Sequence, residues 1–212
     1  MSASPRAGRG LIITVAGPDG SGKTSFCEAL TAGVLRGENV RRIHHRFAGL
    51  PVRGGRTSDT SQPHAQTPYP RGASEAKVLA LFGEWLAGLL FSARPFVRRG
   101  GFLIVERGWW DLAVDPARYR LRSNIGLVRT LGRLLPPSDL LVVLEGPPAL
   151  LATRKRECTE EELARQVTAW RNIVPRRQHT LYVDVSLPLV DVVSRATDEV
   201  LRLAPSLSRR TM

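Results

Sequence analysis

Short apolar runs alternate with longer segments of helical periodicity along this chain. The apolar runs span 11–16, 39–46, 102–106, 140–145 and 180–184, and the segments of helical periodicity span about 23–36, 74–98, 122–134, 148–173 and 188–203. Strands that alternate with helices in this way are typical of βαβ units. Because most of the runs are nearly continuous in apolar residues, we expect strands that are covered on both faces. The pattern predicts a three-layer α/β fold, with a five-stranded parallel sheet between layers of helices.

Two stretches interrupt this alternation. Residues 48–73 are rich in Gly, Pro, Ser, Thr and Arg, a composition that predicts a long loop. The loop follows the second strand, at the end of the sheet where ligands of such folds bind, and we interpret it as a lid over that end. Residues 153–165, TRKRECTEEELAR, mix basic and acidic side chains as a solvated helix face does. We assign one domain to 10–204, with tails at 1–9 and 205–212.

The composition is that of an ordinary globular protein. Apolar residues make up 42% and charged residues 24% of the 212 positions, so the chain can bury a core of its own. The longest apolar runs, such as 11–16 and 140–144, are too short to cross a bilayer as a helix, and the N-terminal segment lacks the apolar stretch of a signal peptide. Cys27 and Cys158 are far apart in sequence and lack metal-ligand spacing. We expect a protein of the reducing cytoplasm that does not span a membrane.

The net charge of +12 admits binding to nucleic acid, because a basic surface attracts phosphate backbones. However, only Lys23, Lys77 and Lys155 among the 31 basic residues are lysines, and the arginines are scattered without a stripe that is interleaved with aromatic residues. We therefore favour a generally basic surface with an anion-binding cleft, and we expect no specific nucleic-acid partner.

The strongest chemical signal is the segment Gly17-Pro-Asp-Gly-Ser-Gly-Lys-Thr24, which has the G-x-x-x-x-G-K-[ST] spacing. It follows an apolar run and precedes a helical segment, so its N–H groups and the helix N-terminus would surround a phosphate. Lys23 would reach the β- and γ-phosphates of ATP, and the hydroxyl of Thr24 would bind Mg²⁺. The alternative, a chance glycine turn, is disfavoured because lysine is rare in this chain. The residues predicted to bind the nucleotide are Gly17, Asp19, Gly20, Ser21, Gly22, Lys23, Thr24 and Ser25.

A second group of polar residues follows the third apolar run, in the sequence Glu106-Arg107-Gly-Trp109-Trp110-Asp111. The carboxyl ends of parallel strands face the ligand crevice, so Glu106 and Arg107 are predicted to point into the site. The carboxylate of Glu106 would hold Mg²⁺ through water, and the guanidinium of Arg107 would grip an acceptor phosphate; a structural ion pair is the alternative. Trp109 and Trp110 look exposed, and they either stack on a base or sugar or pack. Trp109 and Asp111 are included among the candidate acceptor-binding residues.

These residues resemble the thymidylate kinase-like branch of the P-loop nucleoside monophosphate kinases. The phosphate loop is similar to that family's loop, including the acidic residue before the central glycine. Glu106-Arg107 is similar to the family's Asp-Arg pair at the end of the third strand. The resemblance covers nearly the whole chain in the order of its elements. It implies a sheet in the order 2-3-1-4-5, a kinase that uses ATP and Mg²⁺, and a dimeric habit.

The resemblance also implies roles for several basic residues. In that family the arginine at the end of strand three contacts the acceptor phosphate, which assigns this role to Arg107. An arginine that closes the second strand also contributes to acceptor binding, and Arg46 is the nearest candidate. Relatives without a basic residue in the phosphate loop place catalytic arginines in a mobile lid, where they close over the γ-phosphate and exclude water. The candidates in the segment 153–165 are Arg154, Lys155, Arg156 and Arg165.

The chain departs from the family where the acceptor would bind. Relatives that phosphorylate thymidylate follow the strand-three arginine with a tyrosine and a serine-bearing segment, whereas residues 108–120 of this chain read GWWDLAVDPARYR. Three hypotheses therefore stand: a kinase of a nucleoside monophosphate such as dTMP, a kinase of a nucleoside, sugar or antibiotic-like hydroxyl, and a nucleotide-dependent switch. A hydroxyl acceptor needs a general base, for which Glu106, Asp111 and Asp115 are candidates. Against the switch, no guanine-reading Asn-Lys-x-Asp element follows the fourth strand.

The remaining polar residues are less informative. His44, His45 and His64 have no helical metal-ligand spacing, and we interpret them as packing or surface residues. Asp184 ends the fifth strand, where it is predicted either to lie near the adenine or to begin a helix.

Overall fold

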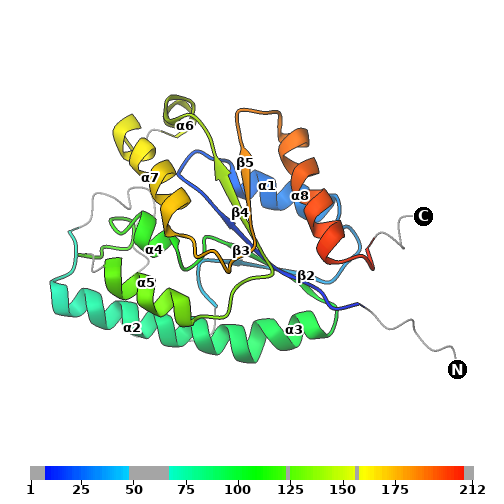
Figure 1. Ribbon diagram of the computed structural model, residues 1–212, viewed down its shortest axis with the longest axis horizontal. Coiled ribbons are helices and arrows are strands. Elements are labelled where there is room, and N and C mark those ends of the chain that lie inside the picture. Colours follow the sequence, from blue (N-terminus) through cyan, green and yellow to red (C-terminus); the bar gives the residue numbers. More distant parts are fainter. Residues whose placement is uncertain (1–7, 48–66, 123–124, 156–157, 208–212) are drawn as a thin grey trace, which may run out of the picture.

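The computed structural model describes residues 8–47, 67–122, 125–155 and 158–207. Its five strands form one parallel sheet in the order β2-β3-β1-β4-β5, with helices on both faces (Figure 1). The predicted fold class and strand order are therefore confirmed. The strands are β1 (Ile12–Ala16), β2 (Val40–His44), β3 (Phe102–Glu106), β4 (Leu140–Glu145) and β5 (Thr180–Asp184). The helices are α1 (Lys23–Ala32), α2 (Arg71–Ala87), the π-helix η2 (Gly88–Ala93), α3 (Arg94–Arg98), α4 (Asp111–Val114), α5 (Ile125–Leu134), α6 (Pro148–Arg154), α7 (Glu160–Ile173) and α8 (Leu189–Leu203).

β1 lies at the centre of the sheet. It pairs with β3 on one side, where Ile13 is opposite Ile104, and with β4 on the other, where Thr14 is opposite Leu141. Every residue of β1 and β3 is buried, as expected for strands that are covered on both faces. Because all neighbouring strands are parallel, their carboxyl ends meet at one edge, and the segments that follow β1, β2 and β3 are brought together there.

Two clusters of buried side chains fill the two faces of the sheet. Successive residues of β1 contribute to opposite clusters, because side chains alternate across a strand. Ile13 and Val15 pack with α1 and α8, whereas Ile12 and Ala16 pack with α2, α4 and α5. Figure 1 shows the same division, with α2, α3 and α5 on one side of the sheet and α1 and α8 on the other.

The elements α2, η2 and α3 form one continuous helical run. The wider π-helical turn comes just before Pro95, whose missing N–H removes a helical hydrogen bond. This run is long and apolar enough to cross a membrane by length and composition alone. The expectation that the chain does not span a membrane was based on continuous apolar runs, and it stays a prediction. Residues such as Val78, Trp85 and Val97 of this run are buried against the sheet, although only 33% of its most apolar stretch is buried.

The predicted helix at 148–173 is divided into α6 and α7. α7 begins after Thr159, because the side chain of Thr159 accepts a hydrogen bond from the Glu162 N–H and caps the helix. The Thr-x-x-Glu spacing is a sequence signature of a helix start. The segment 153–165, predicted to be a lid, therefore contains the end of α6, a connection and the first part of α7.

The predicted boundaries of the long loop and of the C-terminal tail also need correction. The loop predicted at 48–73 ends before Arg71, where α2 begins, and its residues 48–66, including His64, lie outside the described residues. Leu207 is 5% exposed and belongs to the core, so the packed domain extends past the predicted boundary at 204. The terminal residues of both tails likewise lie outside the described ranges.

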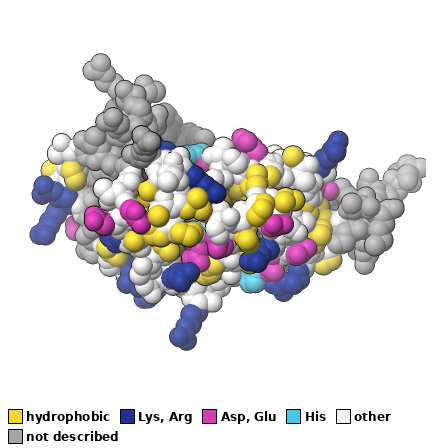
Figure 2. All heavy atoms as spheres, turned by 90° about the horizontal axis from the view of Figure 1, so that it is seen from above, with side chains coloured by type: hydrophobic (Ala, Val, Ile, Leu, Met, Phe, Trp, Pro, Cys, Tyr) yellow, Lys and Arg dark blue, Asp and Glu magenta, His cyan; other side chains and the backbone are white. Residues whose placement is uncertain are grey.

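On the face of the molecule seen in Figure 2, basic side chains are dispersed rather than gathered. On the face seen in Figure 2, Lys and Arg side chains lie mostly around the outline, with acidic side chains between them. Some arginines are paired with carboxylates, as Arg171 is with Glu145 at 2.8 Å and Arg165 with Glu162 at 2.6 Å. The face in Figure 2 therefore offers a nucleic-acid backbone no continuous basic track.

Candidate active site

The phosphate loop, residues 17–24, connects β1 to α1 at the carboxyl end of the sheet. Gly17 has φ 143° and Gly20 has φ 78°, both in the left-handed region that favours glycine. A Cβ at Gly17 would lie 2.2 Å from the carbonyl oxygen of Leu144, and one at Gly20 would lie 2.5 Å from that of Leu151. The loop therefore passes too close to β4 and α6 for any larger residue at these two positions.

Lys23 lies inside this loop and is 6% exposed. Its amine donates to Gly17 O at 2.9 Å, to Pro18 O at 2.7 Å and to Ser21 Oγ at 3.3 Å. Burial, and then the nearby charge of Arg107, lower the pKa of Lys23 from its usual value. A buried cation within a glycine-rich loop, at the start of a helix, fits a site for phosphate groups.

Thr24 and Glu106 meet beside the loop. Thr24 Oγ1 donates to Glu106 Oε1 at 2.8 Å, and Glu106 Oε2 lies 3.6 Å from Arg42 Nη2. A hydroxyl and a carboxylate are oxygen ligands of the kind that Mg²⁺ prefers, with water completing its shell. A bound Mg²⁺ would neutralise charge on the phosphate oxygens of ATP. The structure thus brings together the two residues predicted to hold Mg²⁺.

We expect ATP binding to take up a proton on Lys23 in alkaline solution. In the free protein burial lowers the pKa of Lys23, whereas a bound triphosphate favours the charged amine and raises that pKa. Between the two pKa values the free amine is partly neutral and the bound amine is charged, so ATP affinity falls as the pH rises through this window. Calorimetry at about pH 9, where the phosphates are fully ionised, detects the uptake as a binding heat that depends on the ionisation enthalpy of the buffer.

Asp111→Asn is the control for this measurement, because the charges of Lys23 and Asp111 interact. The variant is expected to retain the proton uptake. A buffer-independent heat in the wild-type protein, or an uptake that disappears in the variant, would contradict the assignment to Lys23.

Three aspartates and two arginines form a buried group beside the phosphate loop, which we call the arginine–aspartate cluster: Asp19, Arg107, Asp111, Asp115 and Arg118. Arg107 Nη2 donates to Asp19 Oδ1 at 2.7 Å, and Arg107 Nη1 lies 3.7 Å from Asp111 Oδ1. Arg118 donates from Nη2 to the other oxygen of Asp19, and from Nε to Asp115 Oδ2 at 3.1 Å. Asp19 therefore binds two guanidinium groups, one on each oxygen.

Two carboxylates of the cluster, Asp19 and Asp111, have pKa values that are shifted in opposite directions. Burial alone raises the pKa of Asp19, but Arg107, Lys23 and Arg118 outweigh it and hold that pKa well below its usual range. In Asp111, burial outweighs Arg107 and Lys23 and raises the pKa above its usual value. The site thus places a carboxylate that stays ionised beside one that titrates closer to neutral pH, an arrangement typical of active sites.

Left-handed backbone at non-glycine residues is found near this cluster. The described residues contain three such positions, His45 at φ 62°, Arg107 at φ 66° and Arg120 at φ 56°. Backbone hydrogen bonds hold the first two, since the N–H of His45 donates to Glu106 O at 2.8 Å and that of Arg107 donates to Val15 O at 2.9 Å. Such conformations cost about 1–3 kcal/mol each and concentrate at functional sites. They mark the ends of β2 and β3 as a candidate acceptor-binding region.

Aromatic rings surround His45 at the end of β2. Its ring centroid lies 4.4 Å from that of Tyr119 and 6.3 Å from that of Trp85, and Nδ1 lies 3.4 Å from the Tyr119 hydroxyl. Burial lowers the pKa of His45 to about 3, so the imidazole is neutral at physiological pH. Burial, followed by the charge of Asp111, raises the pKa of Tyr119. Two neutral polar rings therefore lie beside the arginine–aspartate cluster.

Arg46, predicted to bind the acceptor, is paired with Glu84 of α2. Its Nε lies 3.1 Å from each carboxylate oxygen, and its Nη2 lies 2.5 Å from Oε2. Glu84 is 8% exposed, so the pair fixes Arg46 next to His45 and α2. Contact between Arg46 and an acceptor remains a prediction.

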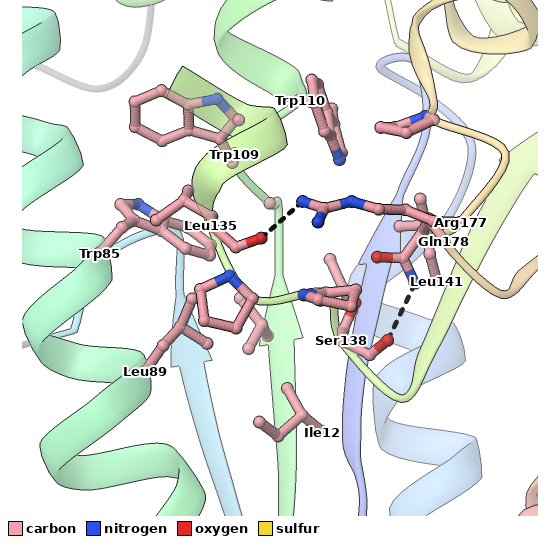
Figure 3. Close-up of a pocket in the computed structure, with 17 residues that line it drawn as sticks. Ile12, Trp85, Leu89, Trp109, Trp110, Leu135, Ser138, Leu141, Arg177 and Gln178 are labelled. Carbon is pink, nitrogen blue, oxygen red and sulfur yellow. Dashed lines mark hydrogen bonds between the residues drawn. The ribbon is translucent and has the colours of Figure 1, made fainter. Parts of the chain in front are cut away.

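Trp109 and Trp110 are buried, so the expectation of exposed indoles is wrong. Trp109 is 4% exposed, and its Nε1 donates to Val128 O at 2.9 Å. Both indoles line a cavity of about 40 Å³ on the α2 and α5 side of the sheet, and the side chain of Arg177 reaches into it (Figure 3). Gly132 is required there, because a Cβ would lie 2.5 Å from each indole. Trp109 therefore packs beneath the sheet, and this position does not support its predicted role in acceptor binding.

Arg154, predicted to be a catalytic arginine of the lid, contacts the segment that follows β5. Its Nη2 donates to Val185 O at 3.1 Å, in the segment that follows β5. With Gly22 and Leu187 it lines a pocket of about 280 Å³ between the phosphate loop and α8. A guanidinium group beside apolar walls suits the base of a nucleotide better than its terminal phosphate. Contact between Arg154 and the γ-phosphate remains a prediction.

The other lid candidates divide into described and undescribed residues. Arg165 Nη2 donates to Val114 O at 2.6 Å and pairs with Glu162, so it joins α7 to α4. Lys155 is the last described residue after α6, and Arg156 lies outside the described residues.

Sequence reasoning missed Arg118, which binds the phosphate loop from a segment 99 residues away. A signal was present, because Asp111, Asp115 and Arg118 recur at spacings of four and three in an otherwise apolar segment. That spacing places charged side chains on one side of a helical turn.

Comparisons with known proteins identify the fold. No family model matches the chain, and no curated protein matches its sequence. Among solved structures, the chain is similar to the thymidylate kinase of Candida albicans, with a TM-score of 0.63 and 16% identity over 94% of each chain. Identity this low shows a shared fold rather than a shared substrate. The fold is thus that of a P-loop kinase, as the resemblance of the motifs implied.

Proposed function

We propose that the protein transfers the γ-phosphoryl group of ATP to a nucleoside monophosphate, with dTMP as the first candidate acceptor. The observation that carries this proposal is the contact between Arg107 and Asp19, which places the guanidinium at the end of β3 directly beside the phosphate loop. A cation at this position can bind the phosphate of an acceptor next to the triphosphate of the donor. The structurally similar kinase, a thymidylate kinase of broad substrate specificity, supports a nucleotide acceptor.

The donor end of the proposed reaction uses the phosphate loop and the pocket lined by Arg154. ATP would place its phosphates on the loop around Lys23 and its base toward Val185 and Leu187. Thr24 and Glu106 would hold Mg²⁺. An acceptor oxygen then forms a bond to the γ-phosphorus while the bond from that phosphorus to the β–γ bridging oxygen breaks, which releases ADP.

A hydroxyl acceptor is the second candidate, and the charge of the cluster favours it. Arg107 lies between the carboxylates of Asp19 and Asp111, and Arg118 lies between those of Asp19 and Asp115. These carboxylates reduce the positive electrostatic potential at the place where the phosphate group of an acceptor would bind. A hydroxyl nucleophile also needs a group to accept its proton, and the raised pKa of Asp111 suits a general base.

An acceptor panel tests both candidates. The protein is incubated with ATP and Mg²⁺ in the presence of nucleoside monophosphates, nucleosides, sugars or aminoglycosides, and ADP release is followed. Turnover with dTMP or another monophosphate supports the first candidate, and turnover with unphosphorylated acceptors alone supports the second. If no acceptor raises ADP release above background, kinase activity toward these classes is contradicted and the switch hypothesis gains.

Arg107→Ala is expected to raise the KM of a phosphorylated acceptor by about tenfold or more, because charge-assisted bidentate contacts to phosphate are lost. The KM of ATP is expected to change much less. Arg129→Ala is the control, since Arg129 is exposed on α5 and donates to the backbone carbonyl of Asn172 in α7. An acceptor KM that stays unchanged in a folded variant would favour a hydroxyl acceptor instead.

We also propose that the protein acts in the cytoplasm and forms a homodimer. Both cysteines, Cys27 and Cys158, are free thiols, which suits a reducing compartment. Leu79, Leu90 and Phe91 are exposed hydrophobic residues on the run formed by α2 and η2, and Phe91 is 81% exposed. A second copy of the chain would cover them.

A further inference from the structure

Arg118 brings a partly buried cation to the phosphate loop from outside the lid. It lies in the turn after α4, and its guanidinium donates to Asp19 Oδ2 within the loop. Its side chain is 15% exposed, and Asp115 binds its Nε at 3.1 Å. A segment that follows β3 thus places a positive charge next to Asp19, in the same loop as Lys23.

The backbone around Arg118 is fixed by its own hydrogen bonds. The N–H of Arg118 donates to Asp115 Oδ1 at 3.2 Å, which starts the turn. The N–H of Arg120 donates to Ala117 O and that of Leu121 to Pro116 O, each at 2.9 Å. The backbone of Arg118 is therefore fixed before any ligand binds, which keeps the guanidinium beside the phosphate loop and limits the rearrangement needed to place its charge on a transition state.

The described lid arginines are engaged elsewhere. Arg154 contacts the segment after β5, and Arg165 contacts Val114 O and Glu162. Among the described arginines that contact the phosphate loop, Arg107 and Arg118 share Asp19. The proposed function assigns Arg107 to the acceptor, so of these two described arginines Arg118 is the candidate for the transferring group.

We propose that Arg118 is a catalytic residue that contacts the transferring phosphoryl group, which is a task that the resemblance assigned to lid arginines. This inference rests on the proposed function. When ATP and Mg²⁺ bind, the guanidinium of Arg118 moves from Asp19 Oδ2 to a non-bridging oxygen of the γ-phosphoryl group and donates hydrogen bonds to it. It transfers no proton, and the bonds that form and break are those of the phosphoryl transfer itself.

The exchange of partners is favourable because Asp19 can release one of its two guanidinium groups. Arg107 stays on Oδ1, so the Asp19 carboxylate keeps a cation when Arg118 leaves Oδ2. Asp115 continues to orient the Nε side of Arg118. In the transition state, negative charge is spread over the γ-phosphoryl oxygens, and an arginine at this position contributes about 10³–10⁵-fold in other phosphoryl-transfer enzymes.

A transition-state analogue provides the test. The wild-type protein, Arg118→Ala and Arg118→Lys are titrated with ADP and Mg²⁺ alone, and with ADP, Mg²⁺, aluminium fluoride and dTMP. In the wild type the second mixture is expected to bind about 100-fold more tightly or more. Arg118→Ala is expected to lose about 100-fold of that gain, while its affinity for ADP changes less than about threefold. Arg118→Lys keeps the charge but not the fork of donors, and it is expected to lose part of the gain.

The outcomes separate this inference from the proposed function. If Arg118→Ala keeps the gain in affinity with the analogue, or if it weakens the binding of both mixtures equally, Arg118 is a structural residue and the inference is overturned. If Arg118→Ala does not fold, Arg118→Lys decides in the same way. A wild-type protein that shows no gain with the analogue contradicts phosphoryl transfer to dTMP itself. Arg202→Ala, an exposed arginine of α8 that is 61% exposed at its side chain, is the matched control and is expected to behave as the wild type does.

Discussion

Replacing Lys23 with alanine is expected to lower kcat for phosphoryl transfer by about 100-fold or more. The amine lies inside the phosphate loop, with its protons on Gly17 O, Pro18 O and Ser21 Oγ. When ATP binds, its phosphate oxygens would replace these neutral acceptors. The negative charge on those oxygens is redistributed during phosphoryl transfer. A cation there therefore stabilises the transition state more than the ground state, so the loss appears in kcat. Steady-state ADP release, with the acceptor that the panel identifies, measures it.

The variant is expected to stay folded, which separates this loss from unfolding. Substitution of Lys23 removes a buried cation whose desolvation is unfavourable, and alanine is compatible with the first turn of α1. The melting temperature is therefore expected to change by only a few degrees. Arg36→Ala is the control, because Arg36 is an exposed cation just beyond the end of the same helix. A folded Lys23→Ala protein with near-normal kcat would refute the role given to Lys23.

The fold could be predicted because its main features depend on local sequence. The apolar runs of β1 and β3 are continuous, and each is buried over its whole length. The spacing from Gly17 to Thr24 specifies a loop between a strand and a helix, and the left-handed glycines explain why that spacing is needed. Local patterns of this kind determine which elements form, and parallel packing then leaves few possible orders of strands.

The candidate site was less predictable because its contacts join distant segments. Asp19 and Arg118 are 99 residues apart, and no local pattern shows that they meet. The sequence equally could not show that Trp109 and Trp110 are buried on the α2 and α5 side of the sheet, because their neighbours there come from distant segments. The placement of Arg154 depends on Val185 in the segment after β5. Side-chain direction at these points follows from tertiary packing rather than from the residues nearby.

Replacing Asp19 with alanine is expected to lower the free energy of unfolding at neutral pH by about 3–5 kcal/mol, because removal of one partner leaves buried charges without compensation. Arg107 and Arg118 both bind this carboxylate, and the Asp19 side chain is 2% exposed. Denaturant unfolding of the wild type and the variant measures the difference. The folded protein holds the pKa of Asp19 below its unfolded value of about 3.9, so the stabilisation is present above that pH and is lost as the pH falls through the folded pKa.

A double variant shows whether the loss comes from the paired arginines. If Arg118→Ala is added to Asp19→Ala, one of the two uncompensated cations disappears, so the double variant is expected to be more stable than the sum of the two single losses predicts. Additive losses would mean that the two residues do not interact energetically, whatever their geometry. In that case the arginine–aspartate cluster would not fix the position of the Arg118 side chain beside the phosphate loop. Coupling would instead show that Asp19 binds Arg118 and so holds beside the phosphate loop the cation on which phosphoryl transfer is proposed to depend.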